Sequence, residues 1–332
     1  MKICILGAGA VGALIGARLA RAGHDVSVLA RGATLAAVRE HGLRVLERDD
    51  AGREQAWSAP VRAEDRAAAL GAQQLVVIAV KAPALAAAAA EVAPLLAAGT
   101  VVLPAMNGVP WWFFAFAQGP LAGARLDSVD PDGAIGSAIA SERVLGAVVH
   151  WASACPQPGV VRRNFGNRMI VGEPRGGDSE RLAAVAGALH AAGFEVDAGL
   201  DVRTEVWFKL WGNMTLNPLS AVTGATADRI LADPGLVRWC VDCMREAAAI
   251  GERIDCPVRQ SPEARLEVAR GLGAFKTSML QDVEAHRPVE LDALVGAVCE
   301  IGARVAVGTP ALDALLGVAR LHARVRGLYP AG

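Results

Sequence analysis

The first thirty-one residues, which begin MKICILGAGAVG, constrain the fold more than any other stretch of this chain. Their hydrophobic pattern predicts an apolar strand, a helix and a second apolar strand, over residues 2–6, 13–22 and 26–30. Gly7, Gly9 and Gly12 follow the first strand at the spacing G-x-G-x-x-G. A lone glycine motif is weak evidence, but a strand before it and a helix after it are typical of a dinucleotide-binding turn.

Each glycine of this turn has a steric role. Gly7 permits the tight turn, Gly9 lets the backbone approach a pyrophosphate, and Gly12 lets the helix pack on the strand. The N-terminus of the helix offers backbone N–H groups and the positive end of its dipole to the phosphates. We therefore expect the cofactor to contact the turn residues Gly7, Ala8, Gly9, Ala10, Val11 and Gly12.

The end of the second strand indicates which dinucleotide is bound. An NAD site usually has Asp or Glu at this place, where the carboxylate binds the ribose 2′-OH. This chain has Ala30 and Arg31 instead. Because a guanidinium can pair bidentately with a 2′-phosphate, we predict NADP(H) as the cofactor. The alternative is that Arg31 is only a solvated loop residue.

Length and composition limit the class of protein. The chain has 332 residues, which is enough for two domains, and its formal net charge of −1 gives no attraction to nucleic acid or to an acidic membrane. The longest apolar stretches are interrupted by glycine or are shorter than the ~20 residues that span a bilayer.

Residues 2–17 resemble a secretory signal, but glycines interrupt them and no clear cleavage site follows. We expect a cytoplasmic protein. A homodimer is compatible with the sequence but is not specified by it.

The cysteines and histidines do not predict a metal site. Cys240 and Cys243 form a C-x-x-C within a predicted helix, but no second pair accompanies them, so two reduced, buried thiols are the simpler interpretation. The six histidines show neither a metal-ligand spacing nor a Ser/His/Asp arrangement. We predict no bound metal.

The remaining elements divide the chain near residue 199. In the first part, alternating strands and helices predict a doubly wound parallel sheet, with strands at 75–80 and 100–103 and a helix at 85–96. Edge strands at 43–47 and 55–61 are joined by a polar turn at 48–53, and hairpin strands after Arg143 should complete the sheet. A helix at 181–192 and a strand at 193–196 follow. Residues 200–332 predict only helices, at 203–216, 234–252, 262–271, 277–285, 290–306 and 310–325.

Two polar residues follow buried strands of the first part. Lys81 comes after the strand at 75–80, and Asn107-Gly108 comes after the strand at 100–103. Ligands of such sheets bind beyond the carboxyl ends of the strands, so both residues are candidates for the site. Taken separately, each also fits an ordinary interpretation, as a solvated lysine and as a common turn.

The helix at 203–216 has a polar column on an otherwise apolar surface. Lys209, Asn213 and Asn217 are spaced i, i+4 and i+8, which places them on one side. A lysine packed among the surrounding Trp, Phe and Leu residues would be partly desolvated, which lowers its pKa toward neutrality and suits it to donate a proton. The pattern alone does not distinguish such a site from a solvated face.

Later in the chain, Ser278 and Asp282 share one face of a helix, and Glu290 begins the next helix. A carboxylate there is also favoured by the helix dipole, which is the purely structural interpretation of Glu290.

Taken in order, the motifs GAGAVG, AVKA, MNG, WFKLWGNMTLNPLSA, SMLQD and VELD resemble the ketopantoate reductase family over almost the whole chain. The resemblance implies a Rossmann-type α/β N-terminal domain (1–199), an all-α C-terminal domain (200–332) and an active site in the cleft between them. It implies NADPH-dependent reduction of the 2-keto group of ketopantoate to (R)-pantoate, a step toward pantothenate and coenzyme A. By motif, the resemblance implies that Lys209 and Glu290 are catalytic groups. It implies that the substrate is bound by Asn107, Asn213, Asn217 and Ser278. It also places Lys81 and Asn107 beside the nicotinamide and its ribose, and Arg31 at the 2′-phosphate.

The chain departs from the family pattern in two places. Ala227 stands where family members have a further substrate-binding asparagine, and the segment VPWWFFAF after Asn107 is bulky and aromatic, which suggests packing more than substrate contact. A relative that reduces a different 2-keto acid is therefore the main alternative. A non-catalytic NADP(H)-binding regulator would not need Lys209 or Glu290, and an opine or polyol dehydrogenase is less consistent with the polar column.

Overall fold

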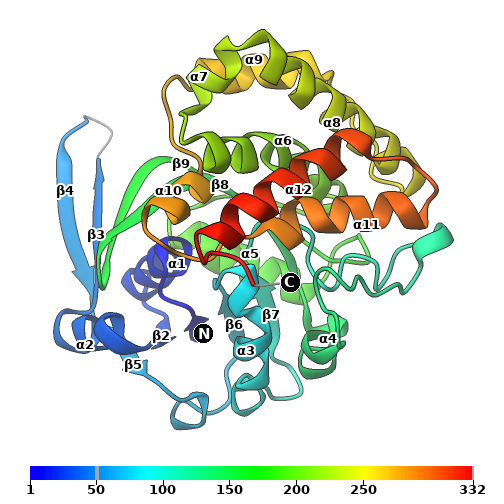
Figure 1. Cartoon of the computed structure of the whole chain (residues 1–332). Helices are drawn as coiled ribbons and strands as arrows, with labels where there is room; N and C mark the ends of the chain where they lie inside the picture. The colour runs from blue at the N-terminus through cyan, green and yellow to red at the C-terminus, as the bar shows by residue number, and fades with distance from the viewer. Residues whose placement is uncertain (49–51, 331–332) are drawn as a thin grey trace. The chain divides into compact units, whose positions relative to one another are not determined.

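The computed structural model describes residues 1–48 and 52–330, and these fall into two compact units. Unit 1 consists of Met1–Met106 and Gly133–Val202, and unit 2 consists of Asn107–Asp132 and Arg203–Gly332 (Figure 1). The sequence predicted a single boundary near residue 199, which differs from this division in one segment. Residues 107–132 group with the helical unit because backbone and side-chain hydrogen bonds tie them there, as described below.

The first sheet of unit 1 has the predicted parallel arrangement. Its strand order is β5-β2-β1-β6-β7, and every pairing is parallel, as in Ile3↔Val26 and Ile3↔Leu75. The strands are β1 (Lys2–Leu6), β2 (Asp25–Leu29), β5 (Arg62–Glu64), β6 (Leu75–Ile78) and β7 (Val101–Pro104). Almost all residues of the central strands are buried, which explains their continuous apolar sequence.

The helices of unit 1 are short apart from two. They are α1 (Ala10–Arg21), α2 (Gly32–His41), α3 (Leu85–Ala90), α4 (Ala134–Ala138) and α5 (Glu180–Ala191). The helix predicted over 85–96 ends early, because α3 stops at Ala90 and a 3₁₀ turn over Ala93–Leu95 replaces its last part. Pro94 lies in that turn, where it has no N–H to continue an α-helix.

The hairpin strands predicted to complete the first sheet form a second sheet instead, so that prediction was wrong. The order is β10-β9-β3-β4, and β8 pairs with β9. The strands are β3 (Leu43–Arg48), β4 (Glu54–Ala59), β8 (Gly146–Gln157), β9 (Val160–Gly172) and β10 (Glu195–Ala198). β8 and β9 have 12 and 13 residues, more than any strand of the first sheet, and β9 pairs with β3 in the register Val45↔Val161. Residues 49–51 of the predicted polar turn lie outside the described residues.

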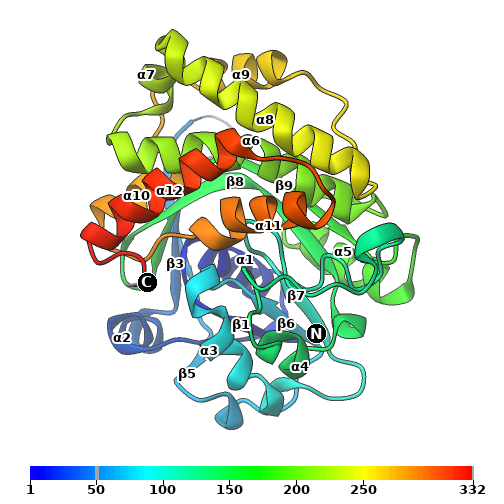
Figure 2. The same cartoon turned by 45° about the vertical axis from the view of Figure 1, so that its right-hand side comes forward.

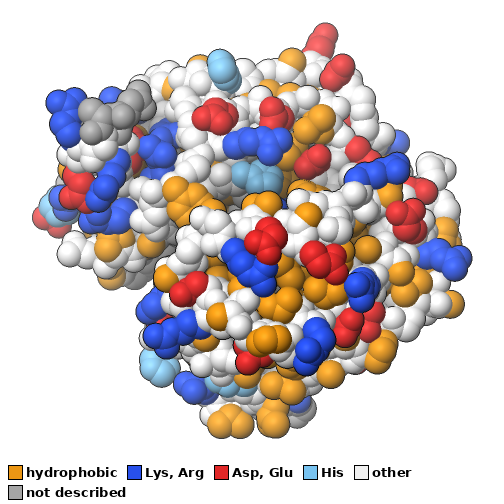
Figure 3. Space-filling model, turned by 90° about the horizontal axis from the view of Figure 1, so that it is seen from above, with side chains coloured by type: hydrophobic (Ala, Val, Ile, Leu, Met, Phe, Trp, Pro, Cys, Tyr) orange, Lys and Arg blue, Asp and Glu red, His pale blue; other side chains and the backbone are white. Residues whose placement is uncertain are grey.

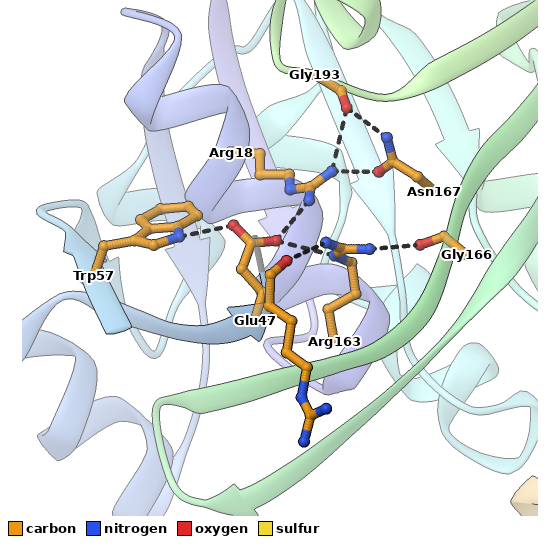
Figure 4. Close-up of polar contacts among 8 residues, drawn as sticks. Arg18, Glu47, Trp57, Arg163, Gly166, Asn167 and Gly193 are labelled. Atoms are coloured by element: carbon orange, nitrogen blue, oxygen red, sulfur yellow. Dashed lines mark hydrogen bonds and ion pairs between the residues drawn. The ribbon is translucent and has the colours of Figure 1, made fainter. Parts of the chain in front are cut away.

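A cluster of charged side chains fastens the second sheet to α1 (Figure 4). Glu47 of β3 accepts hydrogen bonds from Arg18 of α1 at 2.7 Å, from Trp57 of β4 at 2.9 Å and from Arg163 of β9 at 2.9 Å. Burial would raise the pKa of Glu47, but these three donors outweigh it and hold the pKa below its usual value. The helix behind the glycine turn is thereby fixed from its outer side.

The described residues of unit 2 form helices joined by loops and contain no strand, as predicted for residues 200–332. Its helices are α6 (Val202–Thr223), α7 (Ala227–Ala232), α8 (Pro234–Arg253), α9 (Pro262–Gly271), α10 (Ser278–Glu284), α11 (Ala297–Arg304) and α12 (Pro310–Val325). Figures 1 and 2 both show α9 at the top of this unit with α6 beneath it. α6 continues through Pro218, beyond the predicted end at 216. The predicted helix over 290–306 begins as a π-helical segment, η6 (Asp292–Gly296).

The segment 107–132 is held in unit 2 by several hydrogen bonds. The N–H of Val109 donates to the carbonyl of Ala293 at 2.8 Å, and the Glu300 carboxylate accepts from the N–H groups of Asp127 and Ser128. The buried Arg203 of α6 donates from Nε to the carbonyl of Phe113 at 3.0 Å. The aromatic run after Asn107 is buried, so it packs the interior, as the sequence suggested.

The surface charges and the cysteines are arranged as the sequence led us to expect. Side chains of Lys and Arg alternate with those of Asp and Glu over the face in Figure 3, as the small net charge leads one to expect. Cys240 and Cys243 are free and buried, and burial raises the pKa of Cys240 to about 11. None of the described helices is both long and apolar enough to cross a membrane.

Candidate active site

The glycine turn of unit 1 has the tight geometry that its sequence predicts. Gly7 has φ +102°, and a Cβ on it would lie 2.8 Å from Val80 Cγ1. A Cβ on Gly12 would lie 2.1 Å from the carbonyl oxygen of Gly7, so only glycine lets α1 approach the strand. A Cβ on Gly9 would have only the Ala79 oxygen nearby, at 3.9 Å, which leaves its surroundings open.

The start of α1 faces this turn with unsatisfied backbone donors. Gly9 is the N-cap residue, and its carbonyl accepts the first helical hydrogen bond from Ala13 at 2.8 Å. The first N–H groups of an α-helix have no acceptor within the helix, so they can bind an anion. The residues present therefore fit the pyrophosphate of a dinucleotide.

Arg31 and Lys81 follow strands of the same sheet as the glycine turn. Arg31 comes two residues after β2, is 67% exposed at its side chain and forms an ion pair with Glu91 at 2.6 Å. Exposed ion pairs contribute about 0–1 kcal/mol, so a phosphate could replace Glu91 at little cost. Lys81 is half-buried and caps a 3₁₀ turn after β6. Both residues lie beyond carboxyl ends of strands, where ligands of such sheets bind.

In unit 2, the structure brings Asn107 and Lys209 together. Nζ of Lys209 donates a hydrogen bond to Oδ1 of Asn107 at 2.8 Å. Gly108, with φ +88°, makes this possible, because a Cβ on it would lie 2.6 Å from the carbonyl oxygen of Ala293. The turn that ends β7 is thus pressed against η6 and presents the Asn107 amide to the lysine.

Glu290 lies two residues before η6 and acts on the same lysine. It is buried, with 8% of its surface exposed. Burial lowers the pKa of Lys209 from 10.5 to about 8, and the negative charge of Glu290 opposes this shift by raising it. The carboxylate therefore does more than cap a helix. A lysine with a pKa near 8 can give up a proton close to neutral pH.

The other predicted substrate-binding residues lie on α6 and α10. Asn213 and Asn217 lie one and two turns after Lys209 on α6, half-buried and buried respectively. Ser278 is the exposed first residue of α10, which is capped by Thr277. Asp282, on the same helix, is buried and forms an ion pair with Arg287 at 3.1 Å, which indicates a structural role.

The departure from the family pattern at Ala227 is a buried position. Ala227 is the first residue of α7, is fully buried and donates its N–H to the carbonyl of Phe275 at 3.0 Å. It therefore offers no side-chain hydrogen bond to a substrate. Unit 1 thus has a glycine turn that fits a dinucleotide, and unit 2 has a buried lysine of lowered pKa.

A dinucleotide-binding α/β unit joined to a helical unit with such a lysine defines a two-domain oxidoreductase. The chain belongs to the ketopantoate reductase PanE/ApbA family. The family model for ketopantoate reductase PanE/ApbA matches residues 3–176, and the model for its C-terminal part matches residues 201–323.

Individual relatives support the same assignment over the full length. The chain is 46% identical to a 2-dehydropantoate 2-reductase of Mesorhizobium japonicum, over 99% of this chain and 100% of the relative. A crystal structure from Ralstonia solanacearum MolK2, described as a candidate ketopantoate reductase, is 55% identical, with a TM-score of 0.93 and 99% coverage of both chains. A PanE/ApbA family ketopantoate reductase from Ralstonia eutropha JMP134 is 26% identical, with a TM-score of 0.83 over 98% of this chain and 100% of that one.

Proposed function

We propose that this protein reduces the 2-keto group of ketopantoate to (R)-pantoate with NADPH, a step toward pantothenate and coenzyme A. The observation that carries the proposal is the lysine of lowered pKa, Lys209, bonded to Asn107 and close to Glu290. The full-length relative named 2-dehydropantoate 2-reductase supports the choice of substrate.

NADPH, when bound, supplies the hydride that attacks the ketone carbon. In the proposal, the amides of the glycine turn bind its pyrophosphate, and Arg31 exchanges Glu91 for the 2′-phosphate. Lys81 and Asn107 bind near the nicotinamide and its ribose. The open surroundings of Gly9 and the closed surroundings of Gly7 and Gly12 are consistent with this placement.

Lys209 supplies the proton that completes the reduction. Negative charge develops on the keto oxygen as hydride arrives, and a positioned ammonium stabilises that charge and then donates its proton. With a pKa of about 8, Lys209 is mostly protonated at pH 7 and still releases its proton more readily than an ordinary lysine. General-acid catalysis of this kind contributes roughly 10²- to 10⁴-fold in rate.

The neighbours of Lys209 keep it charged and aligned. Glu290 favours the ammonium form and can accept a hydrogen bond from the substrate hydroxyl. Oδ1 of Asn107 accepts a hydrogen bond from the ammonium of Lys209, which orients that group. Asn213, Asn217 and Ser278 can bond the hydroxyl or the carboxylate of the substrate.

A second candidate is the reduction of a different 2-keto acid, and Ala227 is the observation that favours it. A fully buried alanine provides no hydrogen bond at a position where the resemblance implied an asparagine. Losing one such bond can lower kcat/KM considerably for a substrate that needs it.

The experiment that separates the two candidates is NADPH oxidation with a panel of 2-keto acids. We expect ketopantoate to have the highest kcat/KM of the panel, and NADPH to have a lower KM than NADH. A higher kcat/KM with another 2-keto acid would favour the second candidate. A homodimer and a cytoplasmic location stay predictions.

A further inference from the structure

Arg265 of α9 lies against the face of α6 that borders the polar column. Its Cζ lies 5.2 Å from the centroid of the Phe208 ring, and a Cβ on Gly212 would lie 2.9 Å from its Nε. Phe208 and Gly212 immediately precede Lys209 and Asn213 in the sequence. Successive residues of an α-helix differ by about 100° around the axis, so the guanidinium lies on the face next to the catalytic lysine.

Gly212 is what allows the guanidinium to come so close to α6. A Cβ there would also lie 3.0 Å from Nη2 of Arg265. Each residue of this group keeps part of its surface exposed, and the group is Phe208, Lys209, Gly212, Asn213 and Arg265. The guanidinium carbon lies over the Phe208 ring, and the N–H groups of the guanidinium can bind a further partner.

Within the described part of the chain, Arg265 differs from the other arginines that are buried or half-buried. Each of those donates to a carboxylate, amide or carbonyl oxygen, and they are Arg18, Arg143, Arg163, Arg181, Arg203 and Arg320. Arg265 has an aromatic ring as its neighbour but no such oxygen among the described residues. Burial lowers its pKa, with no carboxylate to oppose that shift, yet a guanidinium remains charged at any ordinary pH.

The pair of Lys209 and Glu290 provides no net positive charge for the carboxylate of a substrate. Lys209 and Glu290 carry opposite charges and balance each other. A 2-keto acid brings a carboxylate, which needs a cation of its own when it is partly desolvated. An arginine fork matches a carboxylate bidentately.

We propose that Arg265 binds the carboxylate of the 2-keto acid substrate, with Phe208 as the platform that orients its guanidinium. The proposal rests on the proposed function. It makes Arg265 a residue that selects acids over neutral ketones, while Lys209 serves the keto oxygen.

The test compares an acid with a neutral ketone of the same skeleton. In Arg265→Met, which keeps an unbranched apolar side chain and removes the charge, we expect KM for ketopantoate to rise about 10- to 100-fold, as for a lost charged hydrogen bond. KM for ketopantoyl lactone, which has no carboxylate, should change less than about twofold. Arg265→Lys should recover only part of the loss, because it restores the charge without the fork.

Arg270→Met is the matched control on the same helix. Arg270 donates to Glu267 and to the carbonyl of Leu231, so its loss should leave the preference for the acid over the lactone unchanged. Melting temperatures and NADPH affinity of all variants check that the fold and the cofactor site are intact. Calorimetric binding of pantoate and of pantoyl lactone to the enzyme–NADP⁺ complex gives a second readout that does not need turnover.

An unchanged preference for the acid in Arg265→Met would overturn this inference. If the wild-type protein reduces another 2-keto acid better than ketopantoate, the proposed substrate fails. The same comparison, made with that acid and its neutral amide, still decides the role of Arg265. If the protein binds no 2-keto acid at all, both proposals are overturned.

Discussion

Lys209 and Asn107 are 102 residues apart in the chain, yet Nζ of the lysine donates to Oδ1 of the amide at 2.8 Å. Both residues belong to unit 2, because residues 107–132 pack with the helices that follow residue 202. The contact joins an Asn-Gly turn and a lysine of lowered pKa in one hydrogen-bonded group. Most of the predictions below concern how that group behaves.

The charge next to Lys209 should set its pKa. Asn107→Asp places a carboxylate where the neutral amide now accepts the hydrogen bond. A negative charge favours the ammonium, so the pKa of Lys209 should rise. We expect the alkaline limb of the pH profile of kcat/KM to move to higher pH. A limb that moves to lower pH would contradict this account of Lys209.

The pH dependence of the wild-type enzyme follows from the lowered pKa of about 8. In the proposed mechanism the protonated lysine is the active form for reduction, so the rate should be constant below about pH 7 and fall tenfold per pH unit well above pH 8. Glu290→Gln removes the charge that raises the pKa of Lys209, and the limb should therefore move to lower pH. Glu284→Gln, which disrupts only an exposed ion pair with Lys276, is the control and should leave the limb in place.

Gly12 should tolerate no side chain. In Gly12→Ala, the new Cβ would lie 2.1 Å from the Gly7 oxygen, so α1 must move away from the turn. We expect a stability loss of about 1–3 kcal/mol, typical of overpacking, and NADPH binding weakened about tenfold or more in a fluorescence titration. Gly187→Ala in α5 meets nothing within 4 Å and should be neutral or stabilising. Equal effects of the two substitutions would argue against the steric role of Gly12.

Arg31 should determine the preference for NADPH over NADH. Arg31→Ala should raise KM for NADPH about tenfold and leave KM for NADH nearly unchanged, because only NADPH carries the 2′-phosphate. Glu91→Gln frees Arg31 from its ion pair and should tighten NADPH binding by up to about fivefold. Parallel changes for both cofactors in Arg31→Ala would show that Arg31 does not contact the phosphate.

The sequence predicted those parts of the fold that depend on local pattern. The strand, glycine turn and helix over residues 2–22 follow from apolar runs and steric needs that lie within a few residues of one another. The pairing of β9 with β3 was not predictable, since alternation along a strand does not specify which strand lies beside it.

In the candidate site, too, local pattern predicted some features and long-range folding determined the others. The spacing of Lys209, Asn213 and Asn217 placed them on one side of a helix, and the resemblance to the family implied their roles. The bond from Lys209 to Asn107 depends on how residues 107–132 fold onto η6, which no local pattern encodes. Arg265 lies on an amphipathic helix where arginine is common, so only its missing oxygen partner distinguishes it from a solvated residue.

The most direct measurement of the central claim is the turnover of Lys209→Ala with ketopantoate, made together with its affinity for NADPH. In the proposed mechanism the lysine serves the keto oxygen and the cofactor binds through unit 1. We therefore predict a dissociation constant for NADPH within about twofold of the wild-type value and a kcat lowered roughly 10²- to 10⁴-fold. A variant that binds NADPH and turns over at the wild-type rate would contradict the account.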